Sequence, residues 1–578
     1  MKKLVWIVAL LLLPLSALSQ SWAQYPSYKA VRLGGENMKR VEAHHRRVQE
    51  LGEQLLQEAD TTSLSRERVC LMALIVSTLS VEAQAMGEKP ATLDSLVAVL
   101  TAQLNDRGYW GEPCGKKMDE RQWACNGLVL DALCHYHDQR RNSHVKKQIA
   151  TLASNFYAPH VEQLKRYTLS PRKWWSKLIF WNRKGRGWTF SKERGELMIA
   201  LNGLVHARDV LRDSTLNTVT DAFTTIAANA ASNRQVPVQY RTAALRAMLR
   251  IAEQRDDDRM ARQVLENYNA LLNERLTAGY EVAACDTATQ VAATADAYTL
   301  ANELWRYNRD PRLAELAQLI YYNGLCAMQT SFGDFTSHNV PQPGNPYLYT
   351  VATTDTAGSI HAGIALSSPC RVWMAALADT LYINNFATSV AGVDVKDERI
   401  SLLQTTKYPL DEKSVQLMAL TAAGDTLVWR ILIPHWMKNV RLTVNEEQDT
   451  SVHATPGQYL TLPLSLKEYG TLVLDYEDAT LCQPWDSKVP YPTAFSSDDA
   501  IAADSTTLHR VYCGALLLGC LTDSATGLPQ HVSLEHQRPG QWRVKKSKVK
   551  LQPVHHMMQH DALPRESKPL QLLFPTRK

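Results

Sequence analysis

A cysteine with acidic neighbours is the first feature of this chain that could do chemistry. The stretch YEVAACDTATQV, residues 280–291, carries Cys285 between Glu281 and Asp286, where a loop gives way to small residues with helical character. A thiol at such a position can ligate a metal, attack as a nucleophile, form half of a disulfide or fill the core. The residues alone leave these four roles open, and the choice among them decides whether the chain is an enzyme.

A second group of polar residues follows a predicted helix further along the chain. The stretch SFGDFTSHNVPQPGNPY, residues 331–347, is rich in turn-forming residues and gathers Asp334, His338 and Asn339. Because loops at the open end of a scaffold carry many binding residues, we predict that His338 and Asn339 contact substrate hydroxyls. An ordinary turn-rich connector is the alternative interpretation.

Two aromatic segments could bind sugar rings. PRKWWSKLIFWNRKGRGW, residues 171–188, holds Trp174, Trp175, Trp181 and Trp188 among basic residues, and DRGYWGEPCG, residues 106–115, adds Trp110. Indole faces contact the apolar C–H groups of sugars, and neighbouring arginines suit acidic sugars. We therefore predict Trp188 and Trp110 as substrate contacts. A membrane-surface loop, a plug between domains or a cap over two helices are the alternatives.

The elements that must position these residues are helical in the first two thirds of the chain. In ELMIALNGLVHARDVL, residues 196–211, leucine and valine recur at helical spacing. Similar patterns lie near 38–58, 66–85, 91–105, 119–138, 143–156, 216–231, 237–254 and 257–277. In residues 309–324, Asp310 and Pro311 predict a helix start and Gly324 predicts its end. Paired helices without a fixed-period repeat favour a helical toroid, over 24–385, rather than a solenoid.

The pattern changes to strands near residue 386. SVQLMALTAAGDTLVWRILIPHW, residues 414–436, alternates in polarity and is rich in β-forming residues. Short strands separated by Gly, Pro and Asp predict a β-sandwich over 386–530. Residues 531–578 are basic and weakly patterned, so we predict a C-terminal tail that is either a solvated edge or a loose end.

The N-terminal sequence predicts export. MKKLVWIVALLLLPLSALSQSWAQ has two lysines, an apolar run and then small residues, so residues 1–23 have the pattern of a signal peptide cleaved before Gln24. We expect a periplasmic or extracellular protein. Export and a net charge of only +5 argue against a nucleic-acid partner. No later segment predicts a transmembrane helix.

The cysteines narrow the possible metal chemistry. None of the ten forms a CxxC pair, which excludes a zinc-ribbon site. Cys114 and Cys125 bracket a polar loop and could form a disulfide in an oxidising compartment, with isolated buried thiols as the alternative.

Several segments resemble glycoside hydrolase family 127, the β-L-arabinofuranosidase superfamily. LVWRILIPHWMKNVRLTVNEE, residues 427–447, is similar to that family's Arg–aliphatic–Ile–Pro–x–Trp strand, and PGQYLTL and RVYCGALLLG are similar to later strands. The helix after Cys285, and the next one with its Tyr-Asn-Gly, also resemble the family. The resemblance implies a multidomain α + β chain, an (α/α)6 barrel followed by a β-sandwich. It also implies removal of sugars, β-L-arabinofuranosyl residues among them, from glycan ends.

The resemblance implies a metal site that this chain carries incompletely. In the family, one glutamate and three cysteines hold zinc, one of the cysteines is the nucleophile, and a separate glutamate is the acid/base. The Glu-x-Cys motif falls on Ala283 and Cys285, and the adjacent cysteine pair falls near Pro369 and Cys370. Cys285 and Cys370 are therefore the metal candidates, and the matching carboxylate is missing. Because two thiols fall short of a zinc ligand set, we expect no cofactor, with zinc as the alternative.

Three functions compete on these residues. In the first, Asp286 and Asp334, with Glu281 third, are the catalytic carboxylates of a glycosidase. Retaining hydrolysis needs such groups about 5–5.5 Å apart and inversion about 6.5–9.5 Å. In the second, a reduced zinc site survives. In the third, the chain binds a poly- or oligosaccharide without cleaving it. We predict hydrolysis, with binding alone as the alternative.

Two further interpretations belong to the same residues. Asp286 could lie in the first turn of a helix and complement its dipole without any catalytic role. A polysaccharide lyase with the same architecture could use Tyr280, His338 and Asn339, although no spacing requires it.

Overall fold

The computed structural model describes most of the chain. The described residues are 22–59, 64–115, 117–170, 185–214, 216–340, 348–396, 398–410, 413–422, 424, 426–449, 454–485, 508–522, 526–529, 532–538, 540–557 and 570–575. The predicted signal peptide, apart from Trp22 and Ala23, lies outside them, as do Trp174, Trp175 and Trp181.

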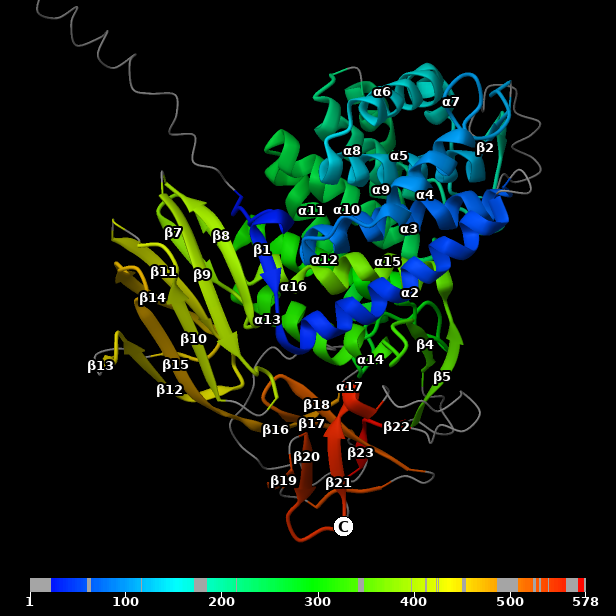
Figure 1. The fold of residues 1–578 in the computed structure, drawn as a ribbon. Coiled ribbons are helices and arrows are strands. Elements are labelled where there is room, and N and C mark those ends of the chain that lie inside the picture. The colour runs from blue at the N-terminus through cyan, green and yellow to red at the C-terminus, as the bar shows by residue number, and fades with distance from the viewer. Residues whose placement is uncertain are drawn as a thin grey trace, which may run out of the picture.

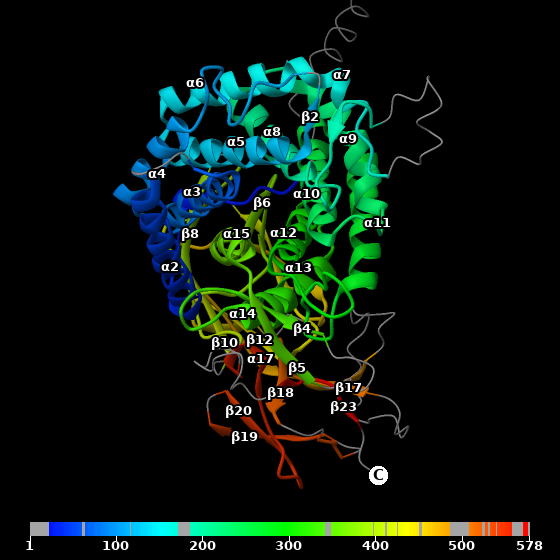
Figure 2. The ribbon, with the colours of Figure 1, turned by 90° about the vertical axis from the view of Figure 1, so that its right-hand side faces the viewer.

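Six helices form a closed inner ring (Figures 1 and 2). They are α3 (Arg66–Met86), α5 (Glu120–Arg140), α8 (Met198–Leu211), α10 (Val238–Arg255), α12 (Val291–Asn308) and α15 (Thr356–Ser367). Each contacts the next, and α15 contacts α3, which closes the ring. This arrangement confirms the predicted (α/α)6 barrel.

A second layer of helices packs on the outside of this ring. It comprises α2 (Gly35–Ala59), α4 (Ala91–Ala102), α6 (Ser143–Leu152), α9 (Leu216–Ser232), α11 (Asp258–Arg275) and α13 (Pro311–Leu319). The predicted start of α13 is confirmed, because the Asp310 side chain accepts a hydrogen bond from the backbone N–H of Arg312 and Pro311 is the first helical residue.

The predicted end of that helix at Gly324 is wrong. Helical structure continues through a π-helical segment, Ile320–Leu325, into α14 (Cys326–Met328). A β-carbon at Gly324 would lie 2.4 Å from the carbonyl oxygen of Tyr280. Gly324 therefore permits close packing of the helix against the loop that precedes α12, and it does not act as a C-cap.

Helix α3 is long and apolar enough to cross a membrane by length and composition, with a mean hydropathy of 1.7 in its most apolar window. Within the barrel, 72% of that window is buried. An inner barrel helix needs the same composition, because both of its faces contact other helices.

Two sheets form the β-sandwich, which begins earlier than residue 386. One sheet has the order β1-β8-β9-β10-β15-β12-β13 and the other β14-β11-β7-β6. Their strands are β1 (Val31–Leu33), β6 (Met374–Leu377), β7 (Thr380–Ile383), β8 (Ser389–Val395), β9 (Glu398–Thr406), β10 (Ser414–Ala419), β11 (Leu427–Ile433), β12 (Met437–Val444), β13 (Glu447–Asp449), β14 (Gln458–Leu464) and β15 (Thr471–Asp478). Strand β1, from the N-terminal segment, pairs with β8 and ties the start of the chain to this domain.

A third sheet corrects the prediction of a loose tail after residue 530. It combines β4 (Thr336–Asn339) and β5 (Leu348–Thr354), from a barrel loop, with β16 (Thr480–Pro484), β17 (Leu508–Cys513), β18 (Leu516–Leu521), β19 (Leu534–Arg538), β20 (Gln541–Val544), β21 (Lys550–Pro553), β22 (Leu570–Gln571) and β23 (Phe574–Pro575). Val544, Leu551 and Phe574 are fully buried. The basic residues of 543–550 are exposed and lie between these buried positions. They make the short alternation of buried and exposed residues hard to recognise in the sequence.

The first described residues pack against the barrel. Trp22 and Ala23 are buried, and Ala23 exchanges two hydrogen bonds with Arg306: its N–H donates to the Arg306 carbonyl at 3.0 Å and its carbonyl accepts from Nε at 2.7 Å. Cleavage before Gln24 would remove both residues, so the position of the predicted cleavage site conflicts with this packing.

Candidate functional site

The barrel has two different ends. Side chains of α10 and α12 pair in order along the two helices: Thr242 donates to Asp296 at 2.8 Å near their starts, and Glu253 binds Arg306 near their ends. Helices α10 and α12 are therefore parallel, and Arg66 at the start of α3 likewise binds Glu196 just before α8. We call the end where they begin the N-terminal mouth, and the opposite end the C-terminal end.

The loop with the candidate thiol lies at the N-terminal mouth but is not the start of a helix. Helix α12 begins at Val291. Before it, bridges join Leu276 to Val282 and Ala283 to Thr289, and the tip of this hairpin exposes Cys285 and Asp286. The alternative that placed Asp286 in the first turn of a helix is therefore wrong.

The Cys285 thiol is exposed and contacts the side chain of Thr287. Its Sγ lies 3.2 Å from Oγ1 of Thr287. Hydrogen bonds from the Thr287 side chain and backbone lower the pKa of this thiol. Among the described side chains, no group of three potential metal ligands includes Cys285. The side chain of Cys370 lies outside the described part of the chain.

Glu281 and His338 form a buried pair beside this hairpin. The carboxylate Oε1 lies 2.6 Å from Nδ1 of His338, and both side chains are almost inaccessible to solvent. The backbone of His338 donates to Oγ1 of Thr289 and accepts from its N–H, both at 2.8 Å. The structure thus brings two predicted site residues together, but in the protein interior. Oε2 of Glu281 and Nε2 of His338 have no hydrogen-bond partner among the described residues.

The remaining predicted polar residues are engaged elsewhere. Nε of Arg47, on α2, donates to both carboxylate oxygens of Asp334 at 3.0 Å. The exposed Asp286 lies 3.6 Å from Arg275, and the exposed Asn339 donates to Oγ1 of Thr350 at 2.9 Å. Each of the three predicted catalytic carboxylates therefore contacts a different basic residue. Among the described contacts, no two of these carboxylates face each other.

The two candidate aromatic contacts have different surroundings. Trp188 is buried against Trp123 and Tyr167, and its indole N–H donates to the carbonyl of Gln163 at 2.8 Å. It is a core residue, and a sugar ring cannot stack on it without opening this cluster. Trp110 is half-buried in the loop before α5, at the N-terminal mouth, where its backbone is held by Asn126.

Other sequence predictions are also corrected by the described contacts. Tyr280, named for a lyase, is fully buried with its hydroxyl 2.9 Å from that of Tyr512. Cys114 and Cys125 are both free thiols, so of the two alternatives left open by the sequence the structure has separate thiols and no disulfide between them.

One acid at the N-terminal mouth was not predicted. Glu196 precedes α8, is half-buried and binds Arg66 at 3.1 Å. Burial raises the pKa of its carboxyl group, although the Arg66 guanidinium opposes this effect. A partly buried acid with a raised pKa has the property that a general acid requires. In the sequence, Glu196 has no feature that separates it from ordinary helix-start glutamates.

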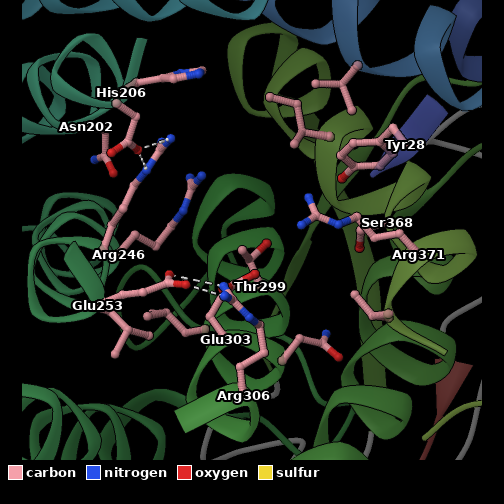
Figure 3. A pocket seen from close by; sticks show the side chains of 18 of the residues that line it. Tyr28, Asn202, His206, Arg246, Glu253, Thr299, Glu303, Arg306, Ser368 and Arg371 are labelled. Atoms are coloured by element: carbon pink, nitrogen blue, oxygen red, sulfur yellow. Dashed lines mark hydrogen bonds and ion pairs between the residues drawn. The ribbon is translucent and has the colours of Figure 1, made fainter. Parts of the chain in front are cut away.

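A cavity of about 580 Å³ opens at the C-terminal end of the barrel. Figure 3 shows Tyr28 and Arg371 on one side of it and His206, Arg246 and Glu253 on the other. Its lining is charged but largely paired. Nη1 of Arg306 donates to Glu253 at 3.1 Å and to Glu303 at 2.5 Å.

Those two glutamates do not form a hydrolytic acid–base pair. Both accept from the same arginine nitrogen, which places the carboxylates next to each other. Burial acts to raise the pKa of Glu303, but the guanidinium groups of Arg306 and Arg371 outweigh it and lower that pKa. A carboxylate that stays ionised cannot protonate a leaving group.

Comparison with known proteins identifies the fold. The family described as "Beta-L-arabinofuranosidase, GH127 middle domain" matches residues 380–477. A solved family 127 β-arabinofuranosidase superimposes with a TM-score of 0.72 at 11% identity, covering 97% of this chain and 99% of that one. A family 127 β-L-arabinofuranosidase from Geobacillus stearothermophilus T6 superimposes with a TM-score of 0.62 at 12% identity, covering 93% and 94%. Among curated proteins, none matches the chain.

The chain has a family 127-like fold. Its helical barrel and β-domains share the architecture of these glycosidases over nearly the whole length, while the identity of 11% marks it as divergent. A structure titled "Glycoside hydrolase" superimposes to a similar extent, with a TM-score of 0.70 over 96% of this chain and 98% of that one.

The described residues of the family 127-like chain do not fit the zinc site that the family implies. Such a site needs thiolates and a carboxylate converging on one point. Cys285 stands at an exposed hairpin tip beside Thr287, and the buried Glu281 is already held by His338.

Proposed function

We propose that the protein is an exported glycan-binding protein with a family 127-like fold. It recognises poly- or oligosaccharides with β-L-arabinofuranosyl ends at the N-terminal mouth, and it does not cleave them by cysteine–zinc chemistry. One observation carries the proposal. The fold extends over nearly the whole length of family 127 enzymes, yet the thiol of Cys285, a predicted metal ligand, is exposed and outside any described ligand cluster.

Binding is favoured over hydrolysis by the state of the predicted carboxylates. Glycoside hydrolysis needs a protonated acid on one side of the bond and an ionised carboxylate on the other. Glu281 is buried against His338, Asp334 accepts two hydrogen bonds from Arg47, and Asp286 lies at the surface. Among the described contacts, none of these three carboxylates faces another carboxylate.

The mouth retains groups that suit a sugar. Trp110 offers an indole ring at the start of α5, and Asn339 offers an exposed amide on β4, which a backbone bridge from Ala288 fixes beside the Cys285 hairpin. Aromatic faces and fixed amides are the usual means of holding sugar rings and hydroxyls.

Hydrolysis by a different acid is the second candidate function. Glu196 supports it, because this carboxyl lies at the same mouth and burial raises its pKa. In that case Glu196 would act as the proton donor to the departing oxygen. Glu193, exposed in the same loop, provides a matched control for this residue.

Two assays on the purified full chain test these functions. Isothermal titration with a β-L-arabinofuranosyl oligosaccharide is expected to show binding that weakens at least tenfold in Trp110→Ala and is unchanged in Tyr469→Ala, an exposed aromatic of the sandwich. A reducing-sugar assay is expected to show no release. Release that disappears in Glu196→Gln but persists in Glu193→Gln would replace the first function with the second.

Export is also part of the proposal, and its support is the N-terminal pattern. Because Trp22 and Ala23 pack into the barrel, we expect the mature chain to retain them. Mass spectrometry of the secreted protein should give an N-terminus before Trp22. A mature chain that starts at Gln24 would contradict this expectation.

A further inference from the structure

Two inner helices bring three metal-ligating side chains together at the C-terminal end of the barrel. Asp131 and His135 lie one turn apart on α5, so they share a face, and His206 on α8 lies opposite them. Among the residues that the structure describes, this is the only group of three such side chains whose ligand atoms all lie within 4.8 Å of one another. The site is separate from Cys285, which lies at the other end of the barrel.

The close approach of these helices has a cause in the sequence. Gly127 and Gly203 face each other where α5 crosses α8. A β-carbon at Gly203 would lie 2.2 Å from the carbonyl oxygen of Gly127, and one at Gly127 would lie 2.3 Å from Cα of Ala200. Because neither glycine has a side chain, the backbones touch, and His206, one turn after Gly203, reaches Asp131.

The distances within the group are close to those of a mononuclear site. Nδ1 of His206 lies 2.7 Å from Oδ1 of Asp131, and Nε2 of His135 lies 3.6 Å from Oδ2 of Asp131. The rings of His135 and His206 have centroids 4.5 Å apart. Tetrahedral zinc with bonds of about 2.0–2.1 Å needs ligand atoms about 3.3 Å apart. Small side-chain rotations would bring all three to that spacing.

The surroundings of the group supply what a metal site needs beyond its ligands. Asp138 accepts from Nε2 of His206 at 3.0 Å, so a second carboxylate fixes the orientation of this imidazole. A carboxylate behind a ligating histidine is the usual partner in zinc sites. His135 and His206 both line the 580 Å³ cavity. Figure 3 shows His206 at the edge of this cavity. A metal held by these side chains would therefore have a remaining coordination position on the cavity side.

We propose that Asp131, His135 and His206 bind a first-row transition-metal dication such as Zn²⁺, with an open coordination position directed into the cavity. Two imidazoles and one carboxylate suit zinc and its neighbours better than Mg²⁺ or Ca²⁺, which prefer oxygen ligands alone. The competing arrangement is a metal-free network in which His206 stays protonated between Asp131 and Asp138. Metal analysis separates the two.

The test is metal binding by the full chain after removal of metal with a chelator. Titration with Zn²⁺ is expected to show one site per chain, and saturating Zn²⁺ should raise the Tm. His135→Ala should abolish both effects, whereas His137→Ala should abolish neither. His137 lies on the same helix but binds the carbonyl of Asn142 and not the group. Asp138→Asn should weaken binding by about 10–100-fold.

A spectroscopic measurement on the unaltered chain keeps the test independent of how the variants fold. Co²⁺ bound at this group should give d–d bands of a nitrogen–oxygen site without thiolate charge-transfer bands, and Cys285→Ser should leave the spectrum unchanged. Absence of stoichiometric metal in the unaltered chain would overturn the proposal. A thiolate spectrum lost in Cys285→Ser would overturn it as well, and would place the metal at the other mouth.

Discussion

Gly203→Ala tests whether the contact between α5 and α8 sets the geometry of the barrel. The new methyl group would lie 2.2 Å from the carbonyl oxygen of Gly127, 3.1 Å from its carbonyl carbon and 3.2 Å from the backbone nitrogen of Asp131. All three obstacles are backbone atoms of a buried helix, so no side chain can rotate away. The helices must separate by about 1 Å to restore ordinary contact distances.

The expected loss of stability follows from two opposing effects. Overpacking of a well-packed core destabilises by about 1–3 kcal/mol, and an obstacle made of backbone belongs at the upper end, about 3 kcal/mol. Alanine is a better helix former than glycine by about 1 kcal/mol, which offsets part of that loss. The net expectation is a decrease of about 2 kcal/mol in the free energy of unfolding.

Urea unfolding followed by tryptophan fluorescence measures this change from the shift in midpoint. Gly115→Ala is the matched control, because nothing lies within 4 Å of a β-carbon there and its φ is not positive. The control should lie within about 0.5 kcal/mol of the unaltered chain. A Gly203→Ala chain as stable as the control would refute the claim that backbone contact fixes the spacing of these helices.

Two other buried contacts make further predictions. Glu315 accepts hydrogen bonds from the backbone N–H and from the ring of His435, and the hydrogen bond to the ring, with the carboxylate charge, raises the pKa of His435. The contact between Glu315 and His435 therefore stabilises the protein fully below about pH 6.5, the pKa of histidine in the unfolded chain, and this stabilisation is lost as pH rises through the folded-state pKa. Glu315→Gln should flatten this part of the Tm-versus-pH profile. An unchanged profile would contradict the prediction. Arg306→Met removes a buried cation shared by two half-buried glutamates, Glu253 and Glu303, and should destabilise the protein by about 1–3 kcal/mol in urea unfolding. Arg312→Met, at the surface, should not, and equal effects would contradict the role given to Arg306.

The helical part of the fold was predictable because its signals are local. Apolar residues at helical spacing indicated most barrel helices to within a few residues, and Asp310 with Pro311 marked a start that the structure confirms. Gly324 misled because a glycine at a helix end and one at a helix contact look the same in sequence. Only the position of the Tyr280 carbonyl distinguishes the two.

The third sheet could not be predicted from local pattern. Its strands come from a barrel loop and from the C-terminal segment, and some are only two residues long, such as Leu570–Gln571, which pairs with Leu348 and Tyr349. Such short strands gain their stability from distant partners. The basic residues around Lys546 and Lys548 suggested a solvated tail, although buried strands flank them.

In the candidate sites, too, local features were predictable from the sequence and contacts between distant elements were not. Glu281 and His338 were both predicted as site residues, but the sequence could not show that Glu281 is buried against His338, because burial depends on the packing of elements distant in the chain. At the other end, Asp131 and His135 have the i, i+4 spacing of a metal pair on a helix. Their third partner, His206, depends on the glycine contact between α5 and α8, which no local pattern reveals.

Titration of the metal-free full chain with a β-L-arabinofuranosyl oligosaccharide, with product analysis of the same sample, tests the proposed function most directly. We predict saturable binding, no released sugar, and the same result for Cys285→Ser. Release of arabinose that requires Cys285 and added zinc would contradict the proposal and restore the cysteine–zinc chemistry of the family.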